Sequence, residues 1–251
     1  MSHIQLDETY KNKNILTITL NNHRHLNALN QQMLEELKSA INDVEKTTST
    51  KVLIIKSNVA KAFSTGINTK FASSLSSQDL TCFFSELSDV LNKIKNLNCI
   101  TIASINGYAF GAGADLAISC DIRLGTSNTQ FRFPGPQFGL ILGTRRLVNE
   151  IGNSKARFIT MTNEVLDSKT SYMFSLIHHI ETEIDSLYKT SLKKAENLSK
   201  LPRHSIKMIK SLTDSHKETN EDYQLTKEST EEDFFQKNFL NYLKIGNEGK
   251  K

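Results

Sequence analysis

In the first half of the chain, continuous apolar runs alternate with stretches in which apolar residues recur at helical spacing. Continuous apolar runs predict buried strands over 15–20, 52–55 and 100–105. Between them, apolar residues return every three or four positions, which predicts a helix capped by Asn30 and a second helix after Ser77. The predicted buried faces of these helices are Met33, Leu34, Leu37, Ala40, Ile41 and Val44, and Leu80, Phe83, Phe84, Leu87, Val90, Leu91 and Ile94. Because such strand–helix–strand units form parallel sheets with right-handed crossovers, the sequence predicts an α/β fold.

The pattern becomes helical from about residue 184, with predicted helices near 184–198, after Pro202 and close to the C-terminus. The last of these carries six large apolar residues among alternating charges, namely Phe234, Phe235, Phe239, Leu240, Tyr242 and Leu243. A lone surface helix would not carry so many. We therefore expect them either to fold back over a binding site or to pack on a neighbouring subunit.

Two short glycine-bearing segments, 62–68 and 107–116, follow the second and third predicted strands. Because the carboxyl ends of parallel strands meet at one edge of a sheet, we expect both segments at that edge. Residues 111–113 open a helix of small residues, whose first N–H groups lack partners and whose glycines allow close approach of a ligand. The sequence thus predicts two backbone N–H groups aimed at one oxygen, an arrangement that stabilises an enolate or a tetrahedral oxyanion.

These two segments resemble the paired oxyanion-hole motifs of the enoyl-CoA hydratase/isomerase (crotonase) superfamily. The stretch 21–30 is similar to the family's N-terminal asparagine-arginine-proline…leucine-asparagine-alanine-leucine motif, 120–123 to its cysteine–aspartate strand entry, and 130–140 to its next strand and turn. The pieces occur in the order found in the family.

The resemblance covers roughly residues 4–245 and implies an architecture. A crotonase-like spiral of ββα units would span 1–195, and 196–251 would form a C-terminal helical region that serves as an oligomerisation surface or a lid. The resemblance also implies homotrimers or dimers of trimers.

Carried over residue by residue, the resemblance implies that the backbone N–H groups of Ile67 and Ala112 hold a thioester carbonyl oxygen. Asp115 falls on the first of two acidic positions that hydratases of the family use, although a carboxylate there can also simply favour the start of a helix. The second acidic position falls on Gly135, which argues against ordinary hydratase turnover because a positioned proton-transfer group contributes about 10²–10⁴-fold. Burial would raise the pKa of Asp115 and a helix N-terminus would lower it, so the sequence leaves the direction open. Three polar side chains could replace the missing acid, and the sequence brings none of them to the substrate: Tyr108, Arg132 and Gln137.

The resemblance further implies that coenzyme A, bound as part of the substrate and with no permanent cofactor, passes along two loops. The coenzyme-contacting residues would be His25, Leu26, Ala28, Ala62, Ser64, Gly66, Asn68 and Gly111. A partly charged His25 would hold a phosphate less firmly than lysine, and it is equally compatible with a simply solvated side chain.

We therefore expect an acyl-CoA enzyme that isomerises or hydrates an enoyl-CoA, with Asp115 moving the proton. Two alternatives stay open. One is an acyl-CoA-binding protein that kept the oxyanion hole and lost catalysis at Gly135. The other is thioester hydrolysis or decarboxylation, which needs the hole and a different proton donor.

Other motifs match less completely. Gly111 and Gly113 could begin a dinucleotide-binding fingerprint, but Leu116 occupies the position of its third glycine. Ser64 would be the nucleophile of a hydrolase elbow that lacks its first glycine. No Cys-x-x-Cys pair and no His-Glu-x-x-His helix occurs, so no metal is predicted.

Composition adds little to this interpretation. The chain has 251 residues with 38% hydrophobic residues, and no segment approaches the length of apolar sequence that spans a membrane. With no targeting pattern, the cytoplasm is the default expectation, and Cys82, Cys99 and Cys120 are expected to be reduced core thiols. The net charge of +4 suits a polyanionic ligand such as coenzyme A, whereas the chain lacks the basic stripe with interleaved aromatic residues that is typical of nucleic-acid binding.

Overall fold

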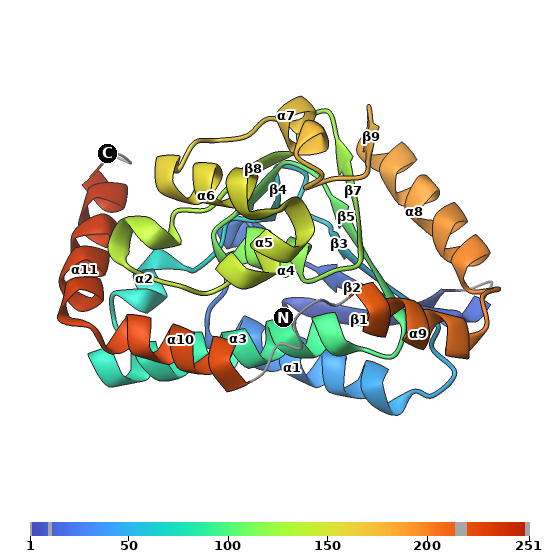
Figure 1. Cartoon of the computed structure of the whole chain (residues 1–251), viewed down its shortest axis with the longest axis horizontal. Helices are drawn as coiled ribbons and strands as arrows, with labels where there is room; N and C mark the ends of the chain where they lie inside the picture. The colour runs from blue at the N-terminus through green and yellow to red at the C-terminus, as the bar shows by residue number, and fades with distance from the viewer. Residues whose placement is uncertain (1, 10–11, 214–219, 249–251) are drawn as a thin grey trace.

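A computed structural model describes residues 2–9, 12–213 and 220–248 of the protein (Figure 1). Its larger sheet has the strand order β1-β2-β3-β5-β7-β9, in which β1 and β2 are antiparallel and the other neighbours are parallel. These strands are β1 (Ile4–Thr9), β2 (Asn12–Leu20), β3 (Val52–Ser57), β5 (Ile100–Ile105), β7 (Ile122–Thr126) and β9 (His179–Glu181). A smaller parallel sheet contains β4 (Ala62–Ser64), β6 (Tyr108–Phe110) and β8 (Gln130–Arg132).

Helices cover both faces of the larger sheet. They are α1 (Gln31–Lys46), α2 (Thr69–Ala72), α3 (Ser77–Asn96), α4 (Ala112–Ile118), α5 (Thr144–Ile151), α6 (Asn153–Thr162), α7 (Ser168–Met173), α8 (Ile184–Leu198), α9 (Arg203–Thr213), α10 (Asn220–Glu231) and α11 (Asp233–Glu248), with short 3-10 turns at His23–His25 (η1) and Gly135–Phe138 (η2). In Figure 1, α1 and α3 run along the lower side of the molecule, α8 stands at the right, and α11 lies at the left.

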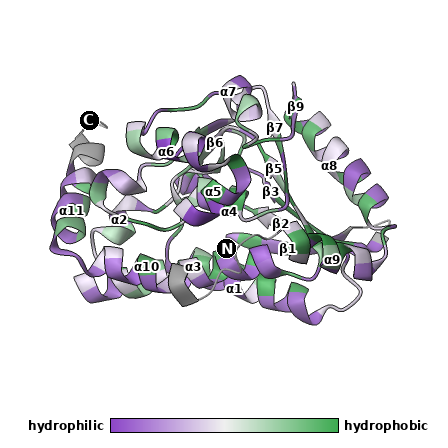
Figure 2. Ribbon diagram, in the orientation of Figure 1, coloured by the Kyte–Doolittle hydropathy of each residue, from purple (hydrophilic) through white to green (hydrophobic). Residues whose placement is uncertain are grey.

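The sheet is buried on both faces because successive side chains of a strand point in opposite directions. In β3, Val52 and Ile54 pack with Leu187 and Ala195 of α8, whereas Leu53 and Ile55 belong to the main core with α1 and α3. This explains why the strand appears in the sequence as a continuous apolar run and not as an alternating one. Figure 2 shows the same division in the helices, which turn their green, apolar sides inward.

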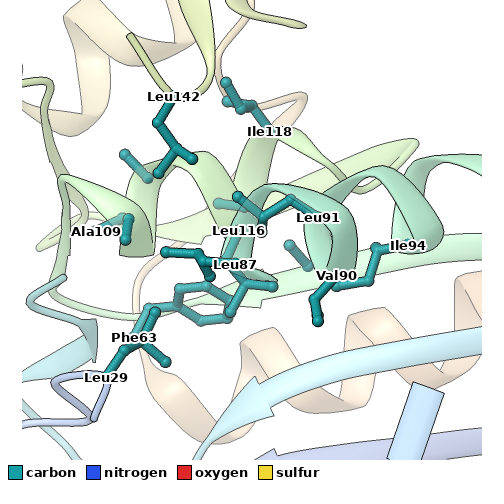
Figure 3. Packing of buried hydrophobic residues seen from close by; sticks show 14 of the residues in the cluster. Leu29, Phe63, Leu87, Val90, Leu91, Ile94, Ala109, Leu116, Ile118 and Leu142 are labelled. Carbon is teal, nitrogen blue, oxygen red and sulfur yellow. The ribbon is translucent and has the colours of Figure 1, made fainter. Parts of the chain in front are cut away.

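The main core joins the two sheets through α3 and α4. Figure 3 shows Leu87 and Leu91 of α3 packed near Phe63 of β4 and Leu116 of α4. All four side chains are fully buried. The core thereby holds β4, which begins the first glycine-bearing segment, and α4, in whose first turns the second segment ends, against α3.

The predicted strands and the first two predicted helices are confirmed. Asn30 caps α1 by accepting a hydrogen bond from the Met33 N–H at 2.9 Å, and all the predicted apolar positions of α1 and α3 are buried. The sequence pattern did not reveal that the two glycine-bearing segments begin with strands of a separate sheet. All three cysteines have free thiols. The expected burial in the core is wrong for Cys82, which is exposed on α3, whereas Cys99 and Cys120 are buried.

The C-terminal helices return to the body of the protein. Helix α10 lies alongside α3 (Figure 1). Phe235, Phe239 and Leu243 of α11 are buried, and the two phenylalanines contact Phe84 and Phe138. The other apolar residues of this helix differ: Tyr242 is half-buried against Phe138, while Phe234 and Leu240 are 59% and 45% exposed. In the described part of the chain, no helix is both long enough and apolar enough to cross a membrane.

A buried ion-pair network ties α5 to the larger sheet. Arg123 of β7 is fully buried, and its Nη2 donates to Glu150 Oε2 of α5 at 2.7 Å, while Lys95 donates to Glu150 Oε1 at 2.9 Å. The His178 Nε2 atom lies 3.1 Å from the same Arg123 nitrogen. Burial and the charge of Arg123 lower the pKa of His178 to about 4, so this ring is neutral near pH 7.

Replacing Glu150 with alanine is expected to lower the free energy of unfolding by about 3–5 kcal/mol, because the buried Arg123 would lose its counter-charge. Urea denaturation followed by circular dichroism measures this loss. Glu45→Ala is the matched control, since Glu45 forms an exposed pair with Lys93 at 3.4 Å and is expected to contribute at most about 1 kcal/mol. If both variants lost the same free energy of unfolding, the buried pair of Glu150 with Arg123 would not be the stabilising interaction.

Candidate active site

The two glycine-bearing segments meet through their main chains. Strands β4 and β6 lie within the two segments and pair in parallel, and each is followed by a turn that contains a glycine, Gly66 or Gly111. An ideal Cβ atom added to Gly66 would lie 2.7 Å from the Phe110 oxygen and 3.3 Å from the Ala112 nitrogen. Since Gly66 also has a φ of +88°, a side chain there is excluded by both space and backbone conformation. The turn at Gly66 therefore lies directly against the main chain that leads into Ala112.

Ile67 and Ala112 follow these turns, and both line one pocket. Among the described residues, neither backbone N–H donates to a protein acceptor. Ala112 is the first residue of α4, and its cap residue Gly111 adopts φ 51° and ψ −124°, a conformation that favours glycine. Ala112 itself does not have a positive φ, so alanine fits this position without strain.

Gly113 has a different role from the one that the sequence suggested. An ideal Cβ atom on Gly113 would lie 2.3 Å from the Ser64 oxygen. The missing side chain therefore makes room for β4 to pack against α4. It does not open a path for a ligand.

The pocket has a volume of about 140 Å³. One wall consists of the two turns and Asp115. Much of the remaining lining is apolar and comes from α3, the region from η2 to α5, and α11: Phe84, Phe138, Leu140, Leu142, Leu147, Phe239, Tyr242 and Leu243. Helix α11 thus returns from the end of the chain to form part of this pocket.

Asp115 lies in the first turn of α4 and is 8% exposed, facing the pocket. Burial raises the pKa of its carboxyl to about 7, while the charge of Arg146 opposes the shift. An ideal Cβ atom on Gly143 would fall 1.9 Å from Asp115 Oδ1, so the carboxyl group rests against the residue that precedes α5. Burial therefore outweighs the opposing charge of Arg146, and the pKa of Asp115 is raised.

Arg146 and Gly143 were not identified from the sequence. Arg146 is buried, and its guanidinium donates to Leu142 O at 3.0 Å and to Asn92 Oδ1. The available signal was the glycine immediately before the amphipathic helix α5. Nothing in the sequence linked that helix to Asp115, about thirty residues earlier.

Asp115→Asn is expected to stabilise the protein increasingly as the pH rises from about 4 to about 7. The raised pKa means that the folded protein keeps the Asp115 proton over this range after the unfolded chain has lost it, so the stability of the unmodified protein falls as the pH rises. A shift from 3.8 to about 7 corresponds to about 4 kcal/mol at the upper end. Thermal unfolding of both proteins at a series of pH values measures this difference, and a difference that does not change with pH would contradict the raised pKa.

The residues predicted to contact coenzyme A do not all have the same surroundings. The loop that contains His25, Leu26 and Ala28 lies beside the first turn, since the Thr65 N–H donates to Leu26 O at 3.2 Å and the Leu29 N–H to Gly66 O at 2.6 Å. His25 is exposed, Leu26 half-buried and Ala28 buried. Gly66 and Gly111 line the pocket.

The side chains of three other residues predicted to contact coenzyme A are either buried in the protein or hydrogen-bonded to its backbone. Ala62 and Ser64 are fully buried in β4, and the Ser64 hydroxyl donates to Asn27 O at 2.7 Å. The Asn68 side chain caps α2 by accepting from the Phe71 N–H at 3.0 Å. Their predicted contact with coenzyme A gains no support from this geometry.

Gly135 lines the pocket, so the site has no second acid at this position. Of the three polar side chains considered as replacements, Arg132 lines the pocket. Gln137 is exposed, and Tyr108 is 36% exposed with its ring stacked on Phe110. The described residues contain no group of three side chains arranged to hold a metal ion.

The fold and the paired turns define a crotonase-fold protein, as comparison with solved structures shows. The enoyl-CoA hydratase from Bacillus anthracis has a TM-score of 0.80 and 22% identity, with 98% of this chain and 96% of that chain covered. The enoyl-CoA hydratase from Bacillus halodurans has a TM-score of 0.83 and 21% identity, with 96% and 100% covered. The predicted crotonase-like α/β fold is therefore confirmed.

The sequence model of the enoyl-CoA hydratase/isomerase family matches residues 10–244. The chain belongs to this family. A human relative, methylglutaconyl-CoA hydratase, is 30% identical over 204 residues, which are 79% of this chain and 60% of the relative. The probable enoyl-CoA hydratase 2 of Arabidopsis thaliana is 27% identical over 82% of this chain and 69% of the relative. The chain thus matches somewhat less than two thirds of the length of the human relative.

Proposed function

We propose that the protein acts on an acyl-CoA thioester, and that Ile67 and Ala112 donate their backbone N–H groups to the thioester carbonyl oxygen while Asp115 moves a proton. The observation that carries this proposal is that both amides and a buried carboxyl with a pKa of about 7 line one pocket. A general base is most effective when its pKa lies near the working pH. Family membership supports coenzyme A as the carrier of the acyl group.

In the proposed reaction, the Asp115 carboxylate removes a proton from the carbon next to the carbonyl. The electron pair moves onto the carbonyl oxygen, where two N–H donors stabilise the negative charge of the enolate. If the carboxyl group exchanges the abstracted proton with solvent before reprotonation, a solvent hydrogen enters the α-carbon. If the substrate is a 3-enoyl thioester, protonation of its dienolate at the γ-carbon moves the double bond to the 2-position. Both outcomes need one carboxyl group.

Hydration needs more than this. Water must lose a proton and add to the β-carbon while the α-carbon gains one, and Gly135 supplies no second proton donor. We therefore place isomerisation ahead of hydration. The pocket volume of about 140 Å³ is close to that of an engineered protein cavity that holds a benzene molecule, which favours a short acyl group. We also propose a homotrimer or a dimer of trimers in the cytoplasm.

Incubation of the protein with butyryl-CoA in heavy water tests the proposal. We expect deuterium at the α-carbon by NMR, and we expect crotonyl-CoA and its 3-enoyl isomer to interconvert faster than water adds. Saturable binding without exchange on any thioester would identify a binding protein instead. Release of free coenzyme A or carbon dioxide as the main product would identify a hydrolase or a decarboxylase.

A further inference from the structure

Arg132 stands out among the described residues that line the pocket, because it is the one with a permanent positive charge. It ends β8, where it lies opposite Phe110 of β6, and its carbonyl oxygen accepts from the Gly111 N–H at 2.9 Å. Its main chain is therefore fixed directly beside the turn that carries Ala112. A strand spacing of about 4.8 Å separates the two backbones.

The Arg132 side chain is held by Asn163, the residue that follows α6. Its Nε atom donates to Asn163 Oδ1 at 3.1 Å and, more weakly, to Asn163 O at 3.4 Å. Asn163 is the C-terminal cap of α6 and adopts the left-handed conformation with φ 55°. Anchoring through Nε leaves the two terminal nitrogens of the guanidinium as a planar fork for a further partner.

No carboxylate of the described residues pairs with Arg132. Arg123 shows the contrast, because it is buried against Glu150. Asp115 is not the partner either, since Arg146 is the cation that acts on its pKa. A half-buried guanidinium at the edge of an apolar pocket is best stabilised by an anionic ligand, and a carboxylate can accept two parallel hydrogen bonds from it.

The position of Arg132 indicates which part of a ligand carries that anion. The phosphates of coenzyme A are separated from the thioester by the whole pantetheine arm. Arg132, in contrast, is one strand away from the turn proposed to hold the thioester carbonyl. An anion that meets Arg132 while the carbonyl meets Ala112 must therefore belong to the acyl group.

We propose that Arg132 binds a second carboxylate at the far end of the acyl chain, so that the preferred substrates are thioesters of short dicarboxylic acids. This inference rests on the proposed function, because it takes the thioester carbonyl to lie at Ile67 and Ala112. It adds a specificity-determining residue and a substrate class to that function.

The test compares glutaryl-CoA with its neutral amide analogue, glutaramoyl-CoA, which has almost the same shape and lacks the charge. The rate of α-proton exchange in heavy water at low thioester concentration gives kcat/KM for each. Because hydrogen bonds to charged groups contribute about 1.5–3 kcal/mol, we expect the unmodified protein to prefer glutaryl-CoA by about tenfold to a hundredfold.

In Arg132→Gln the preference is expected to fall to near unity, and in Arg132→Lys part of it should return, because lysine keeps the charge and loses the fork. Arg157→Gln is the matched control. It removes the same charge from an exposed position of α6 outside the pocket, and it should keep the preference.

The outcomes separate the two proposals. Exchange at equal rates on both thioesters in the unmodified protein would overturn the role of Arg132 and leave the proposed function intact. If no thioester exchanges, the proposed function fails, and calorimetric titration with the two thioesters still decides on Arg132, since equal affinities would overturn its role. If Arg132→Gln does not fold, the preference of the unmodified protein and of Arg132→Lys decides.

Discussion

Asp115→Asn is expected to slow α-proton exchange into butyryl-CoA by about 10²–10⁴-fold, which is the usual contribution of a positioned proton-transfer group. Asparagine keeps the size of the side chain and its place against Gly143, but it cannot accept the proton. NMR measurement of deuterium incorporation quantifies the loss. Binding of the thioester should persist, because the proposed contacts to its carbonyl oxygen come from main-chain groups.

Asp43→Asn makes the same chemical change at an exposed position of α1 and serves as the control. It should leave exchange unchanged. In the unmodified protein the exchange rate should also rise with pH through about 7, as the Asp115 carboxyl ionises. Full activity of Asp115→Asn would show that another group moves the proton.

Gly143→Ala is expected to reduce exchange by about a hundredfold, since a displacement of about 1 Å at a reacting group can cost that much. The added methyl group would fall 1.9 Å from Asp115 Oδ1, so the carboxyl group must move. The backbone of Gly143, with φ −120° and ψ 12°, suits alanine, and we therefore expect the fold to persist. Thermal unfolding and exchange measured on the same sample separate these two effects.

A double variant sharpens this experiment. If Gly143→Ala acts through Asp115, it should add almost nothing to the loss already caused by Asp115→Asn. Independent, additive losses would mean that Gly143 acts on the substrate or on the fold directly.

Much of the fold was predictable because it depends on local periodicity. The apolar run at 52–55 and the apolar stripe of α3 can be read from residues at most four positions apart, and a polar cap such as Asn30 marks where a helix begins. The three-residue strands β4 and β6 are too short to give a period. They became visible only when their pairing was known.

The site was predictable to the extent that it depends on sequence order and resemblance. Ile67, Ala112 and Asp115 were named from two motifs, and the structure places them on one pocket. Gly143 and Arg146 were missed because their relation to Asp115 arises from the packing of α5 against α4, which no local pattern encodes. The direction of the Asp115 pKa shift could not be predicted from the sequence either, because it depends on how completely tertiary packing buries the carboxyl group.

The proposed donors at positions 67 and 112 belong to the polypeptide backbone and follow the paired strands β4 and β6. Substituting a side chain at either position leaves the donor itself in place. The chemistry of such a protein is then decided by a handful of neighbouring side chains, such as those at positions 115, 132 and 135. A new reaction can arise there by single substitutions, without any redesign of the scaffold.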